Sequence, residues 1–136
     1  MPNALPTPIK LVMLQGAFVA SGTYKVSLHN SSYSTATTTY STTNEVSGTG
    51  YMAGGAALAG VTTTTSGTTA YGDANDVVWS SATISGARFA VVYDTVNGPN
   101  RIVAIYDFGA DQSVVSGTLT IVWPTPDATN AMLRVS

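Results

Sequence analysis

The sequence has no cysteine and very few charged residues. Among 136 residues, Lys, Arg, Asp and Glu together make up 9%, against about 25% in typical soluble proteins. Without cysteine the chain has no disulfide, no thiolate nucleophile and no Cys-ligated metal. Its five basic residues leave a net charge of −2, which is too little positive charge for the clustered basic surface that binds nucleic acid. We therefore expect no nucleic-acid partner and no membrane partner.

Residues that favour helices are also scarce. Glu, Lys and Gln are nearly missing, and no segment repeats apolar residues every 3.6 positions. Ser and Thr make up about a quarter of the chain, and 44% of it is hydrophobic, enough for the core of one domain. Charges normally protect strand edges from unwanted pairing. A surface with so few charges indicates a protein covered by neighbours in an assembly; a secreted β domain with a neutral surface is the alternative.

Short apolar and β-branched segments, separated by turn residues, predict about eight strands. We expect an all-β fold, an antiparallel sandwich, with a jelly roll as first choice and a seven-stranded Greek-key sandwich as the alternative. The domain spans residues 10–125, after an extended proline-rich arm at residues 1–9 and before a C-terminal tail or edge strand at 126–136. Predicted strands lie at 10–20, 22–30, 77–84 and 118–123, and a hairpin at 54–72 turns at Ser66–Gly67. Residues 30–43 form a loop or a polar edge strand, and 108–117 form a loop.

A central hairpin is the clearest feature of the sequence. Folding residues 87–107 about Asn97–Gly98 places Arg88 opposite Asp107 and Asp94 opposite Arg101. Opposite charges across strands favour this register, in which we expect both ion pairs on one face and the hairpin buried on both sides. One face then holds Ala90, Val92, Val103 and Ile105, and the other holds Phe89, Val91, Tyr93, Ile102, Ala104 and Tyr106.

Catalytic and metal-binding patterns are weak. His29 is the single histidine, and no nucleophile-elbow motif accompanies it, so we interpret it as a surface residue at the end of a strand. Most of the acidic residues lie at turns or strand ends, where Asp bonds local backbone. Asp73, Asn75 and Asp76 offer oxygens without the spacing of a calcium loop and are interpreted as a turn. We expect no enzyme activity, no cofactor and no metal.

Aromatic residues offer one binding hypothesis. A carbohydrate-stacking surface needs exposed rings, whereas Trp79 and Trp123 lie in apolar segments and are expected to be core or interface residues. The candidates for such a surface are Tyr24, Tyr33, Tyr40, Tyr51, Tyr71, Trp79 and Trp123. The glycines between Gly48 and Gly54 are interpreted as a β connection, because no helix follows them.

Three segments resemble small virion proteins of tailed bacteriophages. The first is TTNEVSGTGY at residues 42–51, with Gly54, Gly55 and Leu58. The second is ARFAVVY at 87–93, followed by Asn100, Arg101 and VAIYDFG at 103–109. The third is SGTLTIVWP at 116–124. The resemblance covers roughly residues 22–125, and neither the N-terminal arm nor the final AMLRVS segment belongs to it.

The resemblance implies a decoration or cement protein on the outer surface of the phage head. Such a protein clamps neighbouring subunits of the major capsid protein and stabilises the assembled shell by mass action. We expect a homo-oligomer, either a dimer or a trimer, with Pro2, Leu5, Pro6 and Pro8 of the arm contacting the partner. A neck, tail or fibre component, including a carbohydrate-binding module that attaches to a host surface, is the alternative.

Overall fold

The computed structural model describes residues 23–96, 100–123 and 132–135. These residues contain seven strands and no helix, so none of the described segments is a helix long and apolar enough to cross a membrane. The chain divides into two compact units. One comprises Met1–Gly22, Ala59–Asn75 and Val122–Ser136, and the other comprises Thr23–Leu58 and Asp76–Ile121. The predicted arm at residues 1–9 and strand at 10–20 lie outside the described residues.

The smaller unit holds a three-stranded antiparallel sheet in the order β3-β4-β7. Its strands are β3 (Thr62–Ser66), β4 (Thr69–Asp73) and β7 (Leu133–Val135). The predicted hairpin is present, but its two-residue turn is Gly67–Thr68, one position later than expected. Gly67 has a φ of 59°, which glycine adopts without strain. Trp123 is buried and donates from Nε1 to the Asn75 carbonyl at 3.0 Å.

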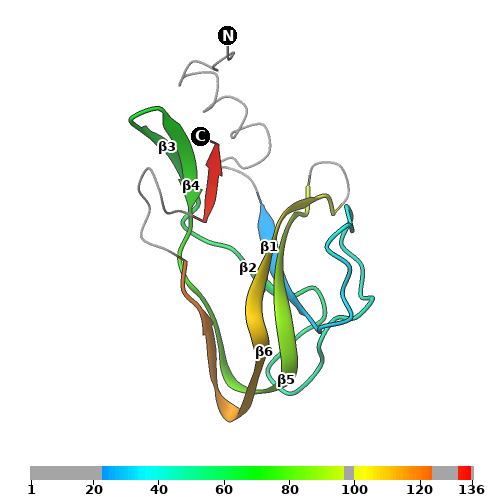
Figure 1. The fold of residues 1–136 in the computed structure, drawn as a ribbon. Helices are drawn as coiled ribbons and strands as arrows, with labels where there is room; N and C mark the ends of the chain where they lie inside the picture. Colours follow the sequence, from blue (N-terminus) through cyan, green and yellow to red (C-terminus); the bar gives the residue numbers. More distant parts are fainter. Residues whose placement is uncertain (1–22, 97–99, 124–131, 136) are drawn as a thin grey trace. The chain divides into compact units, whose positions relative to one another are not determined.

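The larger unit holds a four-stranded antiparallel sheet in the order β2-β1-β5-β6. Its strands are β2 (Ala56–Ala57), β1 (Tyr24–His29), β5 (Val77–Asp94) and β6 (Ile102–Ile121). β5 and β6 run side by side along their whole length (Figure 1). β1 pairs with the second half of β5, from Phe89 to Asp94, and these residues of β5 are all buried.

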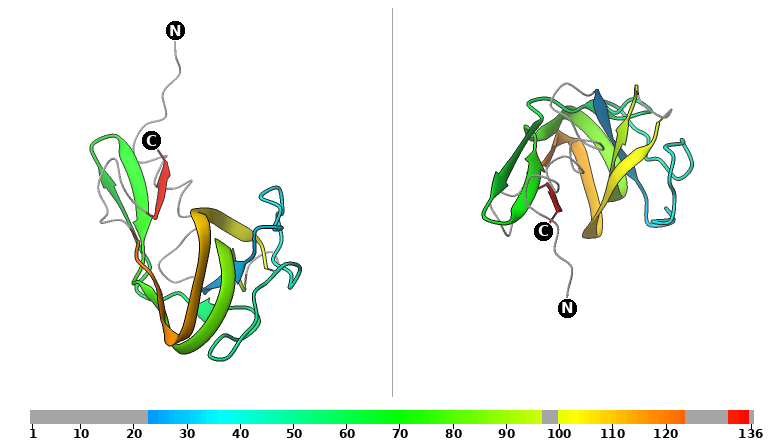
Figure 2. Two further views of the ribbon diagram at one scale, coloured as in Figure 1. Left: turned by 60° about the horizontal axis from the view of Figure 1, so that its bottom comes forward. Right: turned by 90° about the horizontal axis from the view of Figure 1, so that it is seen from above.

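The β5–β6 hairpin has two arms of different composition. We call residues 88–94 and 101–111 the charged arm, because they include Arg88, Asp94, Arg101, Asp107 and Asp111. Residues 77–87 and 112–121 are the uncharged arm, because no Lys, Arg, Asp or Glu lies there. The two strands bend sharply part-way along the hairpin, at the bottom of Figure 1 and of the left view in Figure 2.

β-bulges produce this bend. The β5–β6 register shifts between Trp79 and Ala82, then before Ile84, before Ala87 and before Phe89. Two non-glycine residues at these shifts, Ser81 and Ser116, have φ values of 50° and 46°. An extra residue in one strand of an antiparallel pair bends that strand and increases its twist. The prediction of a loop over residues 108–117 is therefore wrong, because bulges keep this segment inside β6.

The register of the charged arm differs by one residue from the predicted one. Ala90 pairs with Tyr106 and Val91 with Ile105, and an irregularity between Val92 and Tyr93 restores the predicted alignment near the turn. A one-residue slip exchanges the two faces of a strand. Ile105 therefore lies with Phe89 and Val91, and not with Ala90 and Val92 as expected. The turn residues Asn97–Gly98 lie outside the described part of the chain.

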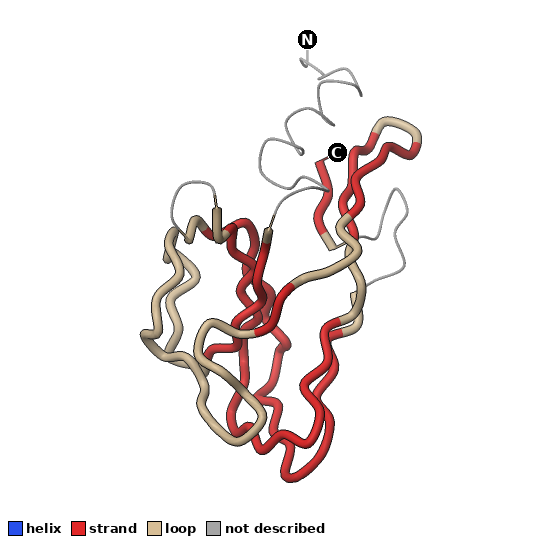
Figure 3. Tube along the Cα trace, turned by 180° about the vertical axis from the view of Figure 1, so that it is seen from behind, coloured by secondary structure: helices blue, strands red, loops and turns tan. Residues whose placement is uncertain are grey.

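The prediction of an all-β antiparallel fold is confirmed. The predicted strand at 22–30 corresponds to β1, and residues 131–136 include β7. The jelly roll and the single domain over residues 10–125 stay predictions. Residues 30–43 form a loop, and with the residues up to Gly55 they make the long irregular connection drawn in tan in Figure 3.

Candidate functional site

A carboxylate surrounded by tyrosines lies where the long connection meets the sheet. Glu45 accepts the Tyr40 hydroxyl at 2.7 Å on Oε2. Its Oε1 accepts the Tyr51 hydroxyl at 2.6 Å and the Gly54 N–H at 2.8 Å. Tyr93 of β5 donates its hydroxyl to the Gly54 carbonyl at 2.6 Å. We call Tyr40, Glu45, Tyr51, Gly54 and Tyr93 the Glu45 cluster.

Backbone pairing with β1 places Glu45 at this position. His29 and Glu45 form an antiparallel bridge, with Asn30 N–H bonded to the Asn44 carbonyl at 2.8 Å and Val46 N–H to the Leu28 carbonyl at 3.0 Å. Asn44 takes a φ of 59° immediately before the carboxylate, a conformation that Asn tolerates better than most residues. The 44–46 segment thus extends the sheet edge beyond β2 and directs Glu45 toward three tyrosines.

The tyrosines of the cluster also stack. The rings of Tyr40 and Tyr93 lie parallel, 4.2 Å between centroids and 6° between planes. Tyr51 accepts the Leu28 N–H at 2.9 Å while donating to Glu45, so its hydroxyl is satisfied in both roles. Shared donors and acceptors of this kind join the loop, β1 and β5 into one network.

A second polar pair, Ser27 and His29, is completely buried on β1. Ser27 Oγ lies 3.0 Å from His29 Nε2, and His29 Nδ1 lies 3.1 Å from the Thr43 carbonyl. Because a carbonyl only accepts, Nδ1 carries the proton and Nε2 accepts the serine hydroxyl. The Tyr33 ring lies 4.2 Å from the imidazole and that of Tyr40 lies 6.2 Å away.

The Ser27–His29 pair has the connectivity of a nucleophile and its base, with a carbonyl orienting the histidine. Both side chains have 0% exposure, so a substrate does not reach Ser27 in this conformation. His29 is the last residue of β1, as the sequence predicted, but the prediction that it lies at the surface is wrong, because the 30–55 connection covers this face of β1. The pair satisfies two buried polar groups and links β1 to Thr43.

Burial shifts the titration of these groups. Burial lowers the pKa of His29 below its ordinary 6.5, while the Thr43 carbonyl and the Glu45 charge oppose the shift. Burial, and after it the hydrogen bond to Glu45, raises the pKa of Tyr40 and of Tyr51 far above 10. Burial also raises the pKa of Tyr93 to about 12. The tyrosines of the Glu45 cluster and the neighbouring His29 are therefore neutral at physiological pH.

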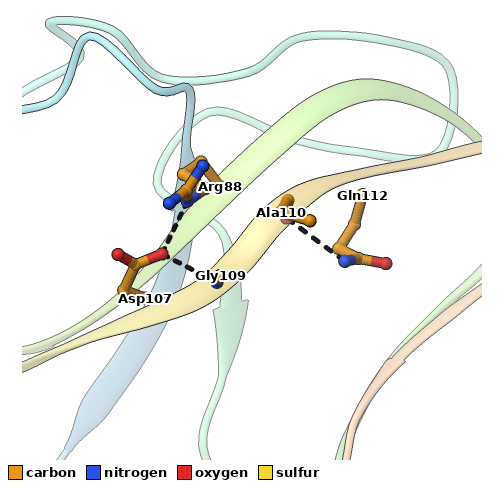
Figure 4. A network of polar contacts seen from close by, with 5 residues as sticks. All are labelled: Arg88, Asp107, Gly109, Ala110 and Gln112. Carbon is orange, nitrogen blue, oxygen red and sulfur yellow. Dashed lines mark hydrogen bonds and ion pairs between the residues drawn. The ribbon is translucent and has the colours of Figure 1, made fainter.

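Both predicted ion pairs are present in the hairpin. Arg88 Nε and Asp107 Oδ1 lie 2.6 Å apart, with side-chain exposures of 30% and 50%. Figure 4 shows this pair, with Asp107 also accepting the Gly109 N–H at 2.8 Å. The Arg88 guanidinium lowers the pKa of Asp107 below 3.8. Arg101 Nη2 lies 4.0 Å from Asp94 Oδ2, and the Asp94 side chain is 2% exposed.

The remaining candidates are the arm residues, a metal site and the stacking aromatics. The predicted partner contacts Pro2, Leu5, Pro6 and Pro8 lie outside the described residues. Within the described part, no three His, Cys, Asp or Glu side chains gather to hold a metal. Most of the candidate stacking aromatics are buried: Tyr24, Tyr33, Tyr51, Trp79 and Trp123. Tyr40 and Tyr71 are partly exposed.

Sequence reasoning missed the Glu45 cluster. One signal was available, because Glu45 is the only Asp, Glu, Lys or Arg between Lys25 and Asp73. A lone carboxylate in such a long neutral segment needs partners if it is buried. The identity of those partners depends on how the loop folds back onto β1 and β5.

Comparison with known proteins identifies no relative. No protein-family model matches the chain, and no curated protein and no solved structure matches it. The resemblance to phage virion proteins therefore stays a prediction from the sequence.

Proposed function

We propose that this chain is a structural virion protein of a tailed bacteriophage, a decoration or cement protein on the outer surface of the head. It clamps neighbouring subunits of the major capsid protein, and its useful surface is a docking face. The residues at 42–58, 87–109 and 116–124 that resemble phage virion proteins are the first support.

The surface of the hairpin is the observation that carries the proposal. The uncharged arm exposes Val78 at 53% and Val115 at 80%, among exposed Ser and Thr residues. Val96 in the same unit is 68% exposed and Met52 is 79% exposed. A surface with so few charges to discourage sticking supports a protein that neighbouring subunits cover in an assembly.

The polar groups inside the larger unit support a structural role as well. The side chains of Glu45, Ser27 and His29 form hydrogen bonds with groups of the protein's own loop and strands. A capsid cement needs a rigid β body, and buried networks that are fully bonded give rigidity. Burial of five candidate aromatics leaves fewer rings for stacking on sugar, which favours protein docking over glycan binding.

The test is mass spectrometry of purified particles of the phage that encodes the chain, with copy numbers measured against the major capsid protein. We expect the copy number of the protein to stand in a fixed ratio to that of the major capsid protein. We also expect the protein to be absent from separated tail fractions. A handful of copies per particle, found with tail or neck proteins, would instead favour the alternative of a neck, tail or fibre component. Absence from particles contradicts both.

The N-terminal arm provides a second measurement. Deleting residues 1–9 should leave the circular dichroism spectrum of the protein unchanged and weaken its binding to particles that lack it. Binding equal to that of the full chain would contradict a role for Pro2, Leu5, Pro6 and Pro8. Glycan-array binding by the full chain, abolished by substitution of Tyr40 or Tyr71, would support the fibre alternative.

A further inference from the structure

Residues 30–46, which we call the cover, lie over one face of the larger sheet and belong to the connection drawn in tan in Figure 3. The Tyr33 ring of the cover lies 4.2 Å from the His29 imidazole and 6.1 Å from the Phe89 ring. His29 and Phe89 are opposite each other in the β1–β5 register, so their side chains share this face. The cover thus separates His29, which has 0% exposure, from solvent.

Three contacts of the cover converge on His29. Its Nδ1 donates to the Thr43 carbonyl at 3.1 Å, its backbone forms the bridge with Glu45, and its ring packs against Tyr33. Its Nε2 accepts the Ser27 hydroxyl at 3.0 Å. The neutral imidazole therefore has both nitrogens bonded when the cover is in place.

A protonated imidazole does not fit this site. Protonation turns Nε2 into a donor, so the Ser27 hydroxyl can no longer donate to it and loses its acceptor. The charge that acts on the imidazole is that of Glu45, whose oxygens are already bonded to Tyr40, Tyr51 and Gly54. A buried charge without a counter-ion in contact is strongly unfavourable.

The other groups around His29 do not compensate for the charge. Tyr33 and Tyr40 are the titratable side chains of the cover that face the ring, and burial raises the pKa of both above 10. The facing side chain of β5 is the uncharged Phe89. The Tyr33 hydroxyl is itself buried without a hydrogen bond, since the Thr37 side chain lies near it but outside hydrogen-bonding geometry. Opening of the cover gives this hydroxyl water as a partner.

We propose that acid releases the cover: protonation of His29 detaches residues 30–46 from β1 and β5 while the sheet beneath them stays folded. The ladders between β1, β5 and β6 do not pass through the cover, so the sheet keeps its own hydrogen bonds. Release exposes Phe89 and Val91, the buried residues that pack with Tyr33. The inference concerns the free protein and does not depend on the proposed capsid role.

Proton linkage sets the size of the effect. Burial lowers the pKa of the covered His29 below its ordinary 6.5, and release of the cover returns the pKa to about 6.5. The proton therefore binds the open form more tightly, and acid favours opening. Between pH 7.5 and 5.0 the ratio of open to closed protein rises up to about 30-fold, a limit reached if the covered histidine stays neutral.

The experiment measures amide hydrogen exchange of the full chain by NMR at pH 7.5 and 5.0, corrected for the intrinsic exchange rate at each pH. The N–H groups of Asn30 and Val46 form hydrogen bonds where the cover meets the end of β1, and they report on its release. We expect their protection to fall at least about tenfold in acid and to be insensitive to low urea, because local opening exposes little surface. The N–H groups of Val91 and Val92 should stay more protected and should respond steeply to urea.

Neutral replacements of His29 provide the comparison. His29→Asn keeps a donor near the Thr43 carbonyl, and His29→Gln keeps an amide near the Ser27 hydroxyl. Neither side chain titrates, so the protection of the cover should be the same at both pH values. Asp111→Asn removes an exposed carboxylate and is the control, which should keep the wild-type response to acid.

Three outcomes would overturn the proposal. The first is equal protection of the cover at the two pH values in the wild type. The second is a response to acid that persists in His29→Asn or His29→Gln. The third is loss of protection at Val91 together with the cover and with the same dependence on urea, which would mean that the whole unit unfolds. The wild-type measurements decide alone if neither variant folds, and the copy number in particles tests the capsid role separately.

Discussion

The two arms of the β5–β6 hairpin share the same strands and differ in almost everything else. In the charged arm, every residue from Phe89 to Asp94 is buried, and the ladder with β6 is regular from Phe89 to Val92. In the uncharged arm, buried residues alternate with exposed ones, and three register shifts interrupt the ladder. Val91 is 0% exposed, whereas Val78 on the same strand is 53% exposed.

This difference follows from what lies beside each arm. β1 pairs with β5 along the charged arm, and the loop that carries Tyr33 and Glu45 covers the same region through the aromatic and polar contacts described above. β1 does not extend alongside the uncharged arm. A strand is buried on both faces only where neighbours and a covering layer exist. Phe89–Asp94 of the charged arm are therefore packed on both faces, whereas the uncharged arm has no such cover among the described residues.

Removal of the Glu45 carboxylate should give the largest effect on the charged arm. Glu45→Ala leaves the donors of Tyr40, Tyr51 and Gly54 without their acceptor. We expect the free energy of unfolding, measured with urea, to fall by about 3 kcal/mol, because hydrogen bonds to charged groups and unsatisfied buried donors each contribute at this scale. Asp111→Ala, which removes an exposed carboxylate, is the control; equal losses in the two variants would refute a structural network.

Matched valines compare the arms directly. Val91→Ala removes two methyl groups from a site with 0% exposure, and should lower the free energy of unfolding by about 2 kcal/mol. Val78→Ala makes the same chemical change at 53% exposure, and should stay within about 0.5 kcal/mol of wild type. Similar losses at both sites would mean that the uncharged arm is also packed.

The stability of the fold should depend on pH through His29, which lies on the covered face of β1. The folded protein holds His29 neutral, with its pKa below the unfolded value of 6.5. The unfolded chain therefore binds the proton first as the pH falls, so stability is full above about 6.5 and declines as the pH drops toward the folded pKa. His29→Gln should have a flatter profile of melting temperature between about pH 7 and 5. An unchanged profile would mean that His29 does not titrate during unfolding.

The smallest effect is expected at the exposed ion pair. Arg88 and Asp107 are 30% and 50% exposed, and exposed ion pairs contribute little because water and salt screen them. Arg88→Ala should therefore melt close to wild type. Asp94→Ala should lower the melting temperature more, because it removes a carboxylate that is 2% exposed and accepts the Val96 N–H at 2.9 Å. If Arg88→Ala were as damaging as Val91→Ala, the pair would have a larger role than its exposure allows.

Some features were predictable because they depend on neighbours in sequence. Alternating β-branched residues and turn glycines predicted β1 and the β3–β4 hairpin, since the period of two and the turn chemistry are local. The positions of the four charged residues predicted both ion pairs of the hairpin, although the predicted register between its two strands was wrong by one residue. Long charged side chains bridge such a slip, so correct ion pairs did not guarantee the correct faces.

The sequence by itself determined the all-β class, the approximate strand positions and the partners of Arg88 and Asp94. Only the tertiary structure decided which face of β6 is inward, where the hairpin bends, how Ser27 and His29 are buried, and which partners surround the partly buried Glu45. Bulges such as those at Ser81 and Ser116 break the period of two that sequence analysis relies on. The Glu45 cluster joins residues from 40 to 93, and contacts between such distant positions exist only once the loop has folded onto the sheet.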